Sequence, residues 1–167
     1  RVQQVAGADG VHLDVVFHQL PVVMVLGFGG ALLHVFNHAL FKGLLFLGAG
    51  AILHNTHERD LEQMGGLLRR MPWTGTFFLI GCLSIASLPP FNGFVSEWLT
   101  FQAALQAWQL DSGVMRSLIP IATAVLALTG ALVAATFVKA YGIAFLGQAR
   151  SRRVRRARRG PPGIRAA

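Results

Sequence analysis

Residues 30–53 read GALLHVFNHALFKGLLFLGAGAIL, and the ionisable side chains within this stretch, His34, His38 and Lys42, are spaced four residues apart. Between Leu20 and Leu53 the chain has no other ionisable residue. Steps of four at about 100° per residue keep the three on one side of a helix, each about 6 Å above the last. Ionisable groups at membrane depth are costly and usually face a bundle interior or a water-filled path. The stretch therefore predicts a transmembrane helix with a ladder of protonatable side chains.

The composition of the whole chain places it in the membrane class. Of its 167 residues, 53% are hydrophobic and 13% are charged, whereas a soluble domain usually has about 25% charged residues. Long apolar runs support the same class. Seven of the fifteen basic residues lie between Arg150 and Arg159, so the rest of the chain is close to neutral. The single cysteine, Cys82, excludes a disulfide framework and is expected to be a small buried hydrophobic residue.

The alternation of apolar runs and breakers predicts an all-α fold, a polytopic transmembrane helical bundle fragment. Gly27, Gly29 and Gly30 are expected to break the first helix, leaving Val15–Phe28 as a partial helix before the main span. His54–Met71 is charged and contains adjacent glycines, so we expect a loop there with at most a short surface helix. The predicted spans are about 30–53, 72–88, 94–109 and 118–146, with Asp111–Ser117 as a polar loop.

One of the predicted helices is interrupted by a Pro-Pro step. Pro72 can begin a helix, since the N–H that it lacks is not needed in the first turn, and Pro89-Pro90 must end it. A new helix is expected near Phe94 with Glu97 one turn in. Irregular backbone at membrane depth survives only where protein or a cavity supplies hydrogen-bond partners. The break therefore predicts that neighbouring protein or a cavity supports the backbone just before Glu97.

Three regions follow from these boundaries: an unassigned N-terminal segment (1–19), a transmembrane region (20–147) and a basic disordered tail (148–167). Positive residues stay in the cytoplasm, so we expect a cytoplasmic tail, the Pro89-Pro90 turn on the inner side, and the Asp111 and His54–Met71 loops outside. The arginine run has no interleaved aromatic residues, so a topology anchor is favoured over nucleic-acid or anionic-lipid binding. Because the chain starts at Arg1 without Met, we expect a piece of a longer protein.

The ladder on the first span has three interpretations. A neutral imidazole can accept a proton on one nitrogen and release one from the other, and its unperturbed pKa of about 6.5 suits transfer near neutral pH. Alternatively, His34 and His38 are hydrogen-bonded to neighbouring helices and Lys42 snorkels to the interface. Histidines at i and i+4 also hold zinc in some helices, but no glutamate stands between these two and no ligand cluster occurs elsewhere. The spacing favours proton transfer.

Two further ionisable residues lie in predicted spans. At Glu97 the helix dipole favours the carboxylate and desolvation disfavours it, so the residue either exchanges protons or is simply held by backbone N–H groups. Lys139 lies near the cytoplasmic end of the last span, where snorkelling is the favoured interpretation and an accessory role in transport is the other. His54 and His57 lie off the face of the ladder and are expected to be ordinary loop residues.

Three ordered motifs resemble the antiporter-like proton-translocating subunits of complex I, of multisubunit sodium/proton antiporters and of membrane-bound hydrogenase complexes. They are His34–Gly48, which resembles the central helix of that family, then Met64–Leu67, then Leu88–Leu99. With Thr136–Ile143 the similarity covers roughly Ala31 to Gly147. The sequences of the first and third motifs most resemble those of the hydrogenase-4 and formate hydrogenlyase members of the family.

The resemblance implies a C-terminal-half fragment of a non-catalytic, ion-translocating subunit in a bacterial inner membrane. It places His34, His38 and Lys42 on a central hydrophilic axis and makes Glu97 the residue that ends the half-channel. Partners would be the lipid bilayer and other membrane subunits of a redox-driven complex, with no nucleic acid. No cofactor or metal is expected on this chain. The alternatives are a truncated fragment that transports nothing and a subunit of a sodium/proton antiporter.

Overall fold

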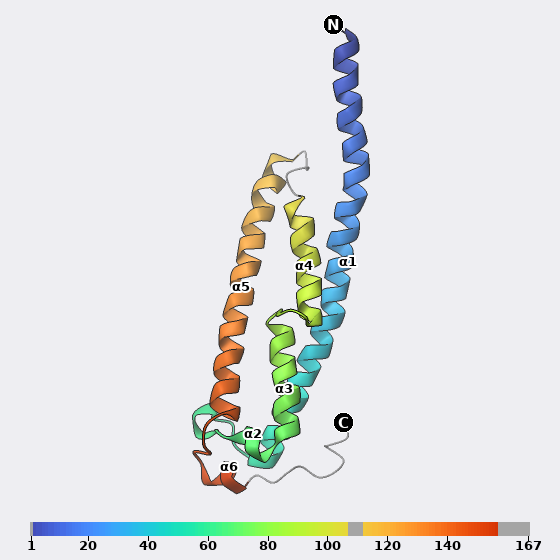
Figure 1. The fold of residues 1–167 in the computed structure, drawn as a ribbon. Helices are drawn as coiled ribbons and strands as arrows, with labels where there is room; N and C mark the ends of the chain where they lie inside the picture. Colours follow the sequence, from blue (N-terminus) through green and yellow to red (C-terminus); the bar gives the residue numbers. More distant parts are fainter. Residues whose placement is uncertain (1, 107–111, 157–167) are drawn as a thin grey trace.

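The computed structural model describes residues 2–106 and 112–156, and the regular elements in these ranges are helices (Figure 1). This confirms the all-α prediction. Pro21–Thr56 and Gly113–Phe145 are long and apolar enough to cross a membrane, and Pro72–Ile85 is a shorter apolar helix. The elements, in chain order, are α1 (Val2–Thr56), the 3₁₀ turn η1 (Leu61–Gln63), α2 (Leu67–Arg70), α3 (Pro72–Ile85), α4 (Asn92–Leu105), α5 (Gly113–Phe145) and α6 (Arg152–Arg156).

Helix α1 runs without interruption for 55 residues, so the predicted break at Gly27–Gly30 is wrong. Gly27 and Gly30 allow close helix packing instead. A Cβ on Gly30 would lie 3.1 Å from the Cβ of Leu99, and a Cβ on Gly27 would lie 3.7 Å from the Cβ of Ala103. Both partners belong to α4, so the missing side chains let α1 and α4 approach each other.

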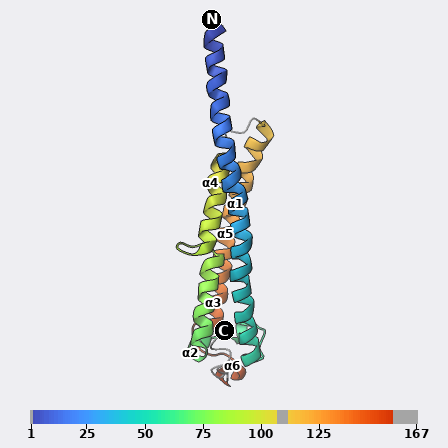
Figure 2. The ribbon, with the colours of Figure 1, turned by 90° about the vertical axis from the view of Figure 1, so that its right-hand side faces the viewer.

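Helices α3 and α4 follow each other end to end and together make one broken crossing (Figures 1 and 2). Each has 14 residues, or about 21 Å, which is less than a hydrocarbon core of roughly 30 Å. The predicted Pro-Pro break is present between Ile85 and Asn92, but the two predicted spans 72–88 and 94–109 form a single crossing. The predicted end of the second one, 107–109, lies outside the described residues.

Helices α1 and α5 run in the same direction, and the α3–α4 crossing runs opposite to both (Figure 1). Helix α1 lies along α4 and α3, and α5 packs against the same pair. The N-terminal turns of α1 extend beyond the ends of α4 and α5 (Figure 2). Helix α5 begins at Gly113, capped by the Ser112 hydroxyl, so it starts five residues earlier than the predicted span and takes in most of the predicted polar loop.

The described part of the basic tail contacts the loop that follows α1, and this overturns the predicted arrangement of the ends. The backbone N–H of Gly66 donates to the carbonyl oxygen of Leu146 at 2.8 Å. Arg150 donates to the backbone carbonyl of Glu62, and Arg153 lies 3.9 Å from the Glu58 carboxylate. The His54–Met71 loop and the tail are therefore at the same end of the bundle. The sequence prediction put them on opposite sides because it counted α3 and α4 as two crossings.

Residues 148–156 are also more ordered than the predicted disordered tail. Helix α6 places Val154 fully inside a small apolar cluster with Leu67 and Phe145, which are 0% and 1% exposed. Met64, Ile52 and Ala144 complete this cluster at the end of the bundle. A buried apolar residue among arginines therefore anchors the start of the tail, while residues 157–167 lie outside the described part of the chain.

This topology predicts which single-cysteine variants react from the same side of a membrane. In a Cys82→Ala background, Gln63→Cys and Arg152→Cys should be labelled by a membrane-impermeant maleimide from one side. Val114→Cys, at the far end of the bundle, should be labelled only from the other side. All three positions are exposed. Labelling of Gln63→Cys and Arg152→Cys from opposite sides would show that α3 and α4 each cross the membrane separately.

Candidate functional site

The face of α1 that contacts α4 is polar in its middle part. His34 lies one turn after Gly30, and Asn37 follows three residues later. The Nδ1 of His34 lies 3.0 Å from the Ser96 hydroxyl, which belongs to the second turn of α4. Ser96 is 0% exposed, and its hydroxyl also donates to the carbonyl oxygen of Gly93 at 2.9 Å. A histidine on one membrane helix is thus joined to a buried hydroxyl just after the helix break.

Two asparagines join the same helices at the start of α4. The side-chain amide of Asn37 donates to the backbone carbonyl of Asn92 at 3.0 Å, and the Asn92 amide donates to Oδ1 of Asn37 at 3.1 Å. Asn37 is 5% exposed. Buried amides need such partners because an unpaired polar group in an apolar region is costly. The reciprocal pair therefore fixes the first residue of the helix after the break against α1.

His38 and Lys42 progressively leave this interface. The rings of His34 and His38 are stacked with centroids 6.0 Å apart, and His38 also meets the edge of Phe41. Each step of four residues turns by about 40°, so Lys42 lies about 80° around the helix from His34. Lys42 is exposed within this chain, and neighbouring Phe41 is 4% exposed. The structure thus brings the two histidines together and places Lys42 on an adjoining face of α1.

Glu97 points to a different neighbour from Ser96, about 100° around α4. A Cβ built on Gly130 of α5 would lie 3.9 Å from Oε2 of Glu97, so the carboxylate faces α5. Glu97 is partly buried. Among the described residues no hydrogen bond or ion pair joins Glu97 to the histidines or to Lys42. Helix α4 therefore carries two adjacent polar groups directed to different neighbours, Ser96 to α1 and Glu97 to α5.

The remaining ionisable candidates are peripheral. Lys139 is exposed on α5, on the half that leads to the basic end. His54 belongs to the last turn of α1 rather than to a loop, and its ring lies 6.5 Å from that of His57. Within residues 2–106 and 112–156, no three His, Cys, Asp or Glu side chains gather as a ligand set for a metal would.

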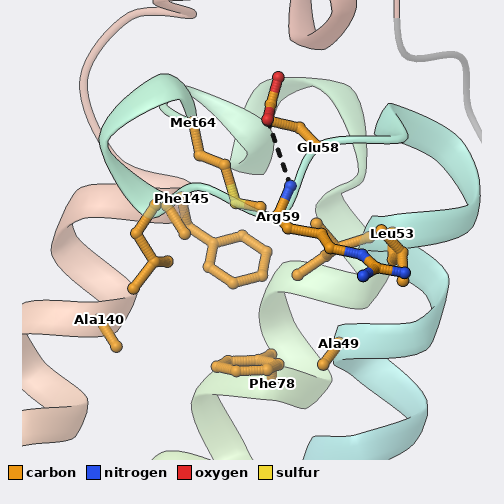
Figure 3. Close-up of a pocket in the computed structure, with 11 residues that line it drawn as sticks. Ala49, Leu53, Glu58, Arg59, Met64, Phe78, Ala140 and Phe145 are labelled. Carbon is orange, nitrogen blue, oxygen red and sulfur yellow. Dashed lines mark hydrogen bonds between the residues drawn. The ribbon is translucent and has the colours of Figure 1, made fainter.

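A cavity of about 290 Å³ lies between α1, α3 and α5 near the basic end (Figure 3). Its walls are mostly apolar, and the backbone N–H of Arg59 donates to the Glu58 carboxylate at its mouth. The described residues that line it include no histidine or lysine, so the cavity is separate from the polar contact between α1 and α4. Its apolar walls are Ala49, Ile52, Leu53, Leu61, Met64, Phe78, Ala140, Ala144 and Phe145.

Sequence reasoning missed three residues of the polar interface: Asn37, Asn92 and Ser96. All three lie in motifs whose ionisable residues were considered as candidates instead. The available signal was a polar residue three positions after a histidine on an apolar helix, and two polar residues just past a Pro-Pro break. Pairing residues 55 positions apart, as in Asn37 and Asn92, required the fold.

A double-mutant cycle on the asparagine pair should reveal their coupling. Asn37→Leu leaves the side-chain amide and the backbone carbonyl of Asn92 without their Asn37 partners, and Asn92→Leu removes only the donor to Oδ1 of Asn37. The double variant removes both amides. We expect a coupling energy of about 0.5–1.5 kcal/mol, the range found for polar contacts between membrane helices. The measurement is unfolding of the purified full-length protein in detergent. Strictly additive losses would show that the two side chains do not interact.

Comparisons with known proteins agree with the motifs. A profile of the NADH:quinone oxidoreductase/Mrp antiporter transmembrane family matches residues 10–120. Hydrogenase-4 component B of Escherichia coli K12 is 52% identical over 131 residues, which are 78% of this chain and 20% of that protein. Formate hydrogenlyase subunit 3 of the same organism is 40% identical over 147 residues, 88% of this chain and 23% of that protein. A Na⁺/H⁺ antiporter protein of Alkalihalophilus pseudofirmus is 43% identical over 103 residues, 62% and 12% of the two chains.

The chain spans about a fifth of the length of the first two relatives. The matched region includes the polar part of α1, the helix break and α4. It also covers most of the stretch from Ala31 to Gly147 that resembles the family in sequence. This part contains His34, His38, Lys42 and Glu97. With more than half of its residues matched, this helical membrane chain belongs to the NADH:quinone oxidoreductase/Mrp antiporter transmembrane family.

Proposed function

We propose that this chain is part of a proton-translocating membrane subunit of a redox-driven complex of the hydrogenase-4, formate hydrogenlyase or NADH:quinone oxidoreductase type. The polar contact between α1 and α4 carries the proposal: His34 meets Ser96 next to a helix break, inside otherwise apolar membrane helices. Polar and ionisable groups at membrane depth are costly, and they mark ion pathways when they face a protein interior.

In this proposal protons pass between His34, His38, Lys42 and Glu97 through ordered water. The stacked rings of His34 and His38, with centroids 6.0 Å apart, would be successive members of this path. Because α4 directs Glu97 toward α5, water must also connect the two sides of α4. A charge that arrives at one group alters the protonation of the next. A nearby opposite charge favours the charged form of a group, and a nearby like charge favours its neutral form. Lys139 has at most an accessory part.

The proposal extends to the partners and the orientation of the chain. Electron transfer would belong to other membrane-bound and peripheral subunits, so this chain would be non-catalytic. We further propose that the basic end faces the cytoplasm of a bacterial inner membrane. The tail now shares this end with Arg59, Arg69 and Arg70, which strengthens the positive-inside signal over that of the tail alone.

A sodium/proton antiporter is the second candidate function. The observation in its favour is the 43% identity to the Na⁺/H⁺ antiporter protein of Alkalihalophilus pseudofirmus. Reconstitution of the assembled complex in liposomes, with a pH-sensitive dye inside, separates the two. Proton movement that needs the redox reaction and is independent of Na⁺ supports the redox-driven pump, whereas proton movement that depends on a Na⁺ gradient supports the antiporter.

Glu97→Gln tests the carboxylate in the same liposomes. The amide keeps the size of the side chain but cannot exchange a proton, so proton flux should fall at least tenfold. The matched control is Glu62→Gln in the exposed loop, which should keep wild-type flux. Wild-type flux with Glu97→Gln would remove Glu97 from the pathway and leave a role in helix packing.

A further inference from the structure

Ser96 has one hydroxyl proton and two neighbours that could receive it. Its Oγ lies 2.9 Å from the carbonyl oxygen of Gly93 and 3.0 Å from Nδ1 of His34. The carbonyl is only an acceptor, whereas a ring nitrogen is a donor or an acceptor depending on the tautomer. The side chain is 0% exposed, so bulk water does not supply an alternative partner. Each of the two contacts needs one proton, and only the serine hydroxyl and the histidine ring can supply it.

The carbonyl contact decides how the protons are shared. If the hydroxyl donated to Nδ1, two oxygen acceptors would face each other at 2.9 Å with no proton between them, which is unfavourable in a buried site. If the hydroxyl donates to Gly93, its lone pairs are free and His34 must donate from Nδ1. Only the second allocation satisfies both contacts. Neutral His34 then carries its proton on Nδ1 and a lone pair on Nε2.

From this geometry we infer that His34 takes up and gives back protons on Nε2 alone, with Ser96 as the positioning residue that holds Nδ1–H. A proton that binds Nε2 gives the imidazolium, which still donates from Nδ1 to the serine oxygen. Loss of the same proton from Nε2 restores the starting tautomer. The contact with α4 is therefore unchanged throughout the cycle. This inference rests on the proposed function, because it concerns the protons that the pathway carries.

The consequence is that no proton passes through the imidazole ring toward α4. Such a passage would put the Nδ1 proton on Ser96, whose own proton points to the Gly93 carbonyl and has no further acceptor there. Ser96 precedes Glu97 in sequence, so its hydroxyl looks like the shortest link from the histidines to the carboxylate. The inference excludes that link: protons would reach Glu97 by water around α4, entering and leaving His34 on the side of Nε2.

The tautomer can be measured directly. In the assembled complex with ¹⁵N-labelled histidine, a His34→Gln variant identifies the His34 resonances. Wild-type neutral His34 should show a protonated Nδ1 and a bare Nε2, and Ser96→Thr, which keeps a hydroxyl, should show the same pattern. Ser96→Ala should give a mixture of both tautomers. A wild-type neutral ring protonated on Nε2, or an unchanged pattern in Ser96→Ala, would overturn the inference.

Proton flux in the same complex separates this inference from the proposed function. Ser96→Ala should lower the flux at least tenfold, and Ser96→Thr should restore most of it. Thr100→Val is the matched control, because the Thr100 hydroxyl one turn later donates to the Ser96 carbonyl within its own helix. If His34→Gln keeps wild-type flux, the proposed role of His34 fails even where the tautomer is as expected. If His34→Gln loses flux and Ser96→Ala does not, only the role of Ser96 fails.

Discussion

Replacing Lys42 with Met should reduce proton flux by about 100-fold or more, while the complex still assembles. The thioether side chain has similar length and no proton to exchange, and loss of a positioned acid–base group typically costs about 10²–10⁴ in rate. Lys42 is exposed on α1 and makes no hydrogen bond to another described residue, so its removal leaves no buried partner unpaired. The measurement is dye-detected proton uptake by liposomes that contain the assembled complex.

Lys139→Met is the matched control for this experiment. Lys139 is also an exposed lysine on a membrane-spanning helix, but it lies on α5 toward the basic end. Its replacement should leave at least half of the wild-type flux. Wild-type flux with Lys42→Met would show that the lysine of the ladder snorkels and that the pathway uses other groups. Equal losses in both variants would show that Lys139 is as important for transport as Lys42.

The sequence predicted the helical class, the break at Pro89-Pro90 and the family, because each depends on local signals. Apolar runs of membrane length, a Pro-Pro step and three ordered motifs can all be recognised without knowing which helices touch. Proximity of His34 and His38 also followed from helical periodicity alone. The position of Lys42 on an adjoining face of α1 needed the structure, since it depends on which face α4 covers.

The errors in the predicted topology come from residues whose role is set by distant partners. Gly27 and Gly30 looked like helix breakers, yet they allow packing against Ala103 and Leu99, which lie on a helix far along the chain. Helices α3 and α4 looked like two spans because their apolar runs were extended to 88 and 109. Val154 could not be identified as an anchor among arginines, because its apolar surroundings come from Leu67 and Phe145.

Replacing Gly93 with Ala should destabilise the protein by about 2–3 kcal/mol, the upper part of the range for overpacking a filled site. Gly93 lies in the first turn of α4, and an added Cβ would collide with the backbone carbonyl oxygen of Ser84 in the last turn of α3. A carbonyl in a helix cannot rotate away as a flexible side chain can. The two halves of the broken crossing would have to separate, which would also strain the contacts of Asn92 and Ser96 with α1.

Gly29→Ala is the control that isolates this collision from the general effect of adding a methyl group to a helix. A Cβ on Gly29 meets no described atom within 4 Å, and alanine is favoured over glycine in a helix interior by up to about 1 kcal/mol. Thermal unfolding in detergent should therefore leave Gly29→Ala at or above wild-type stability. Gly93 has no positive φ, so a loss confined to Gly93→Ala cannot come from backbone strain. Equal stability of both variants would show that α3 and α4 are not in close contact at the break.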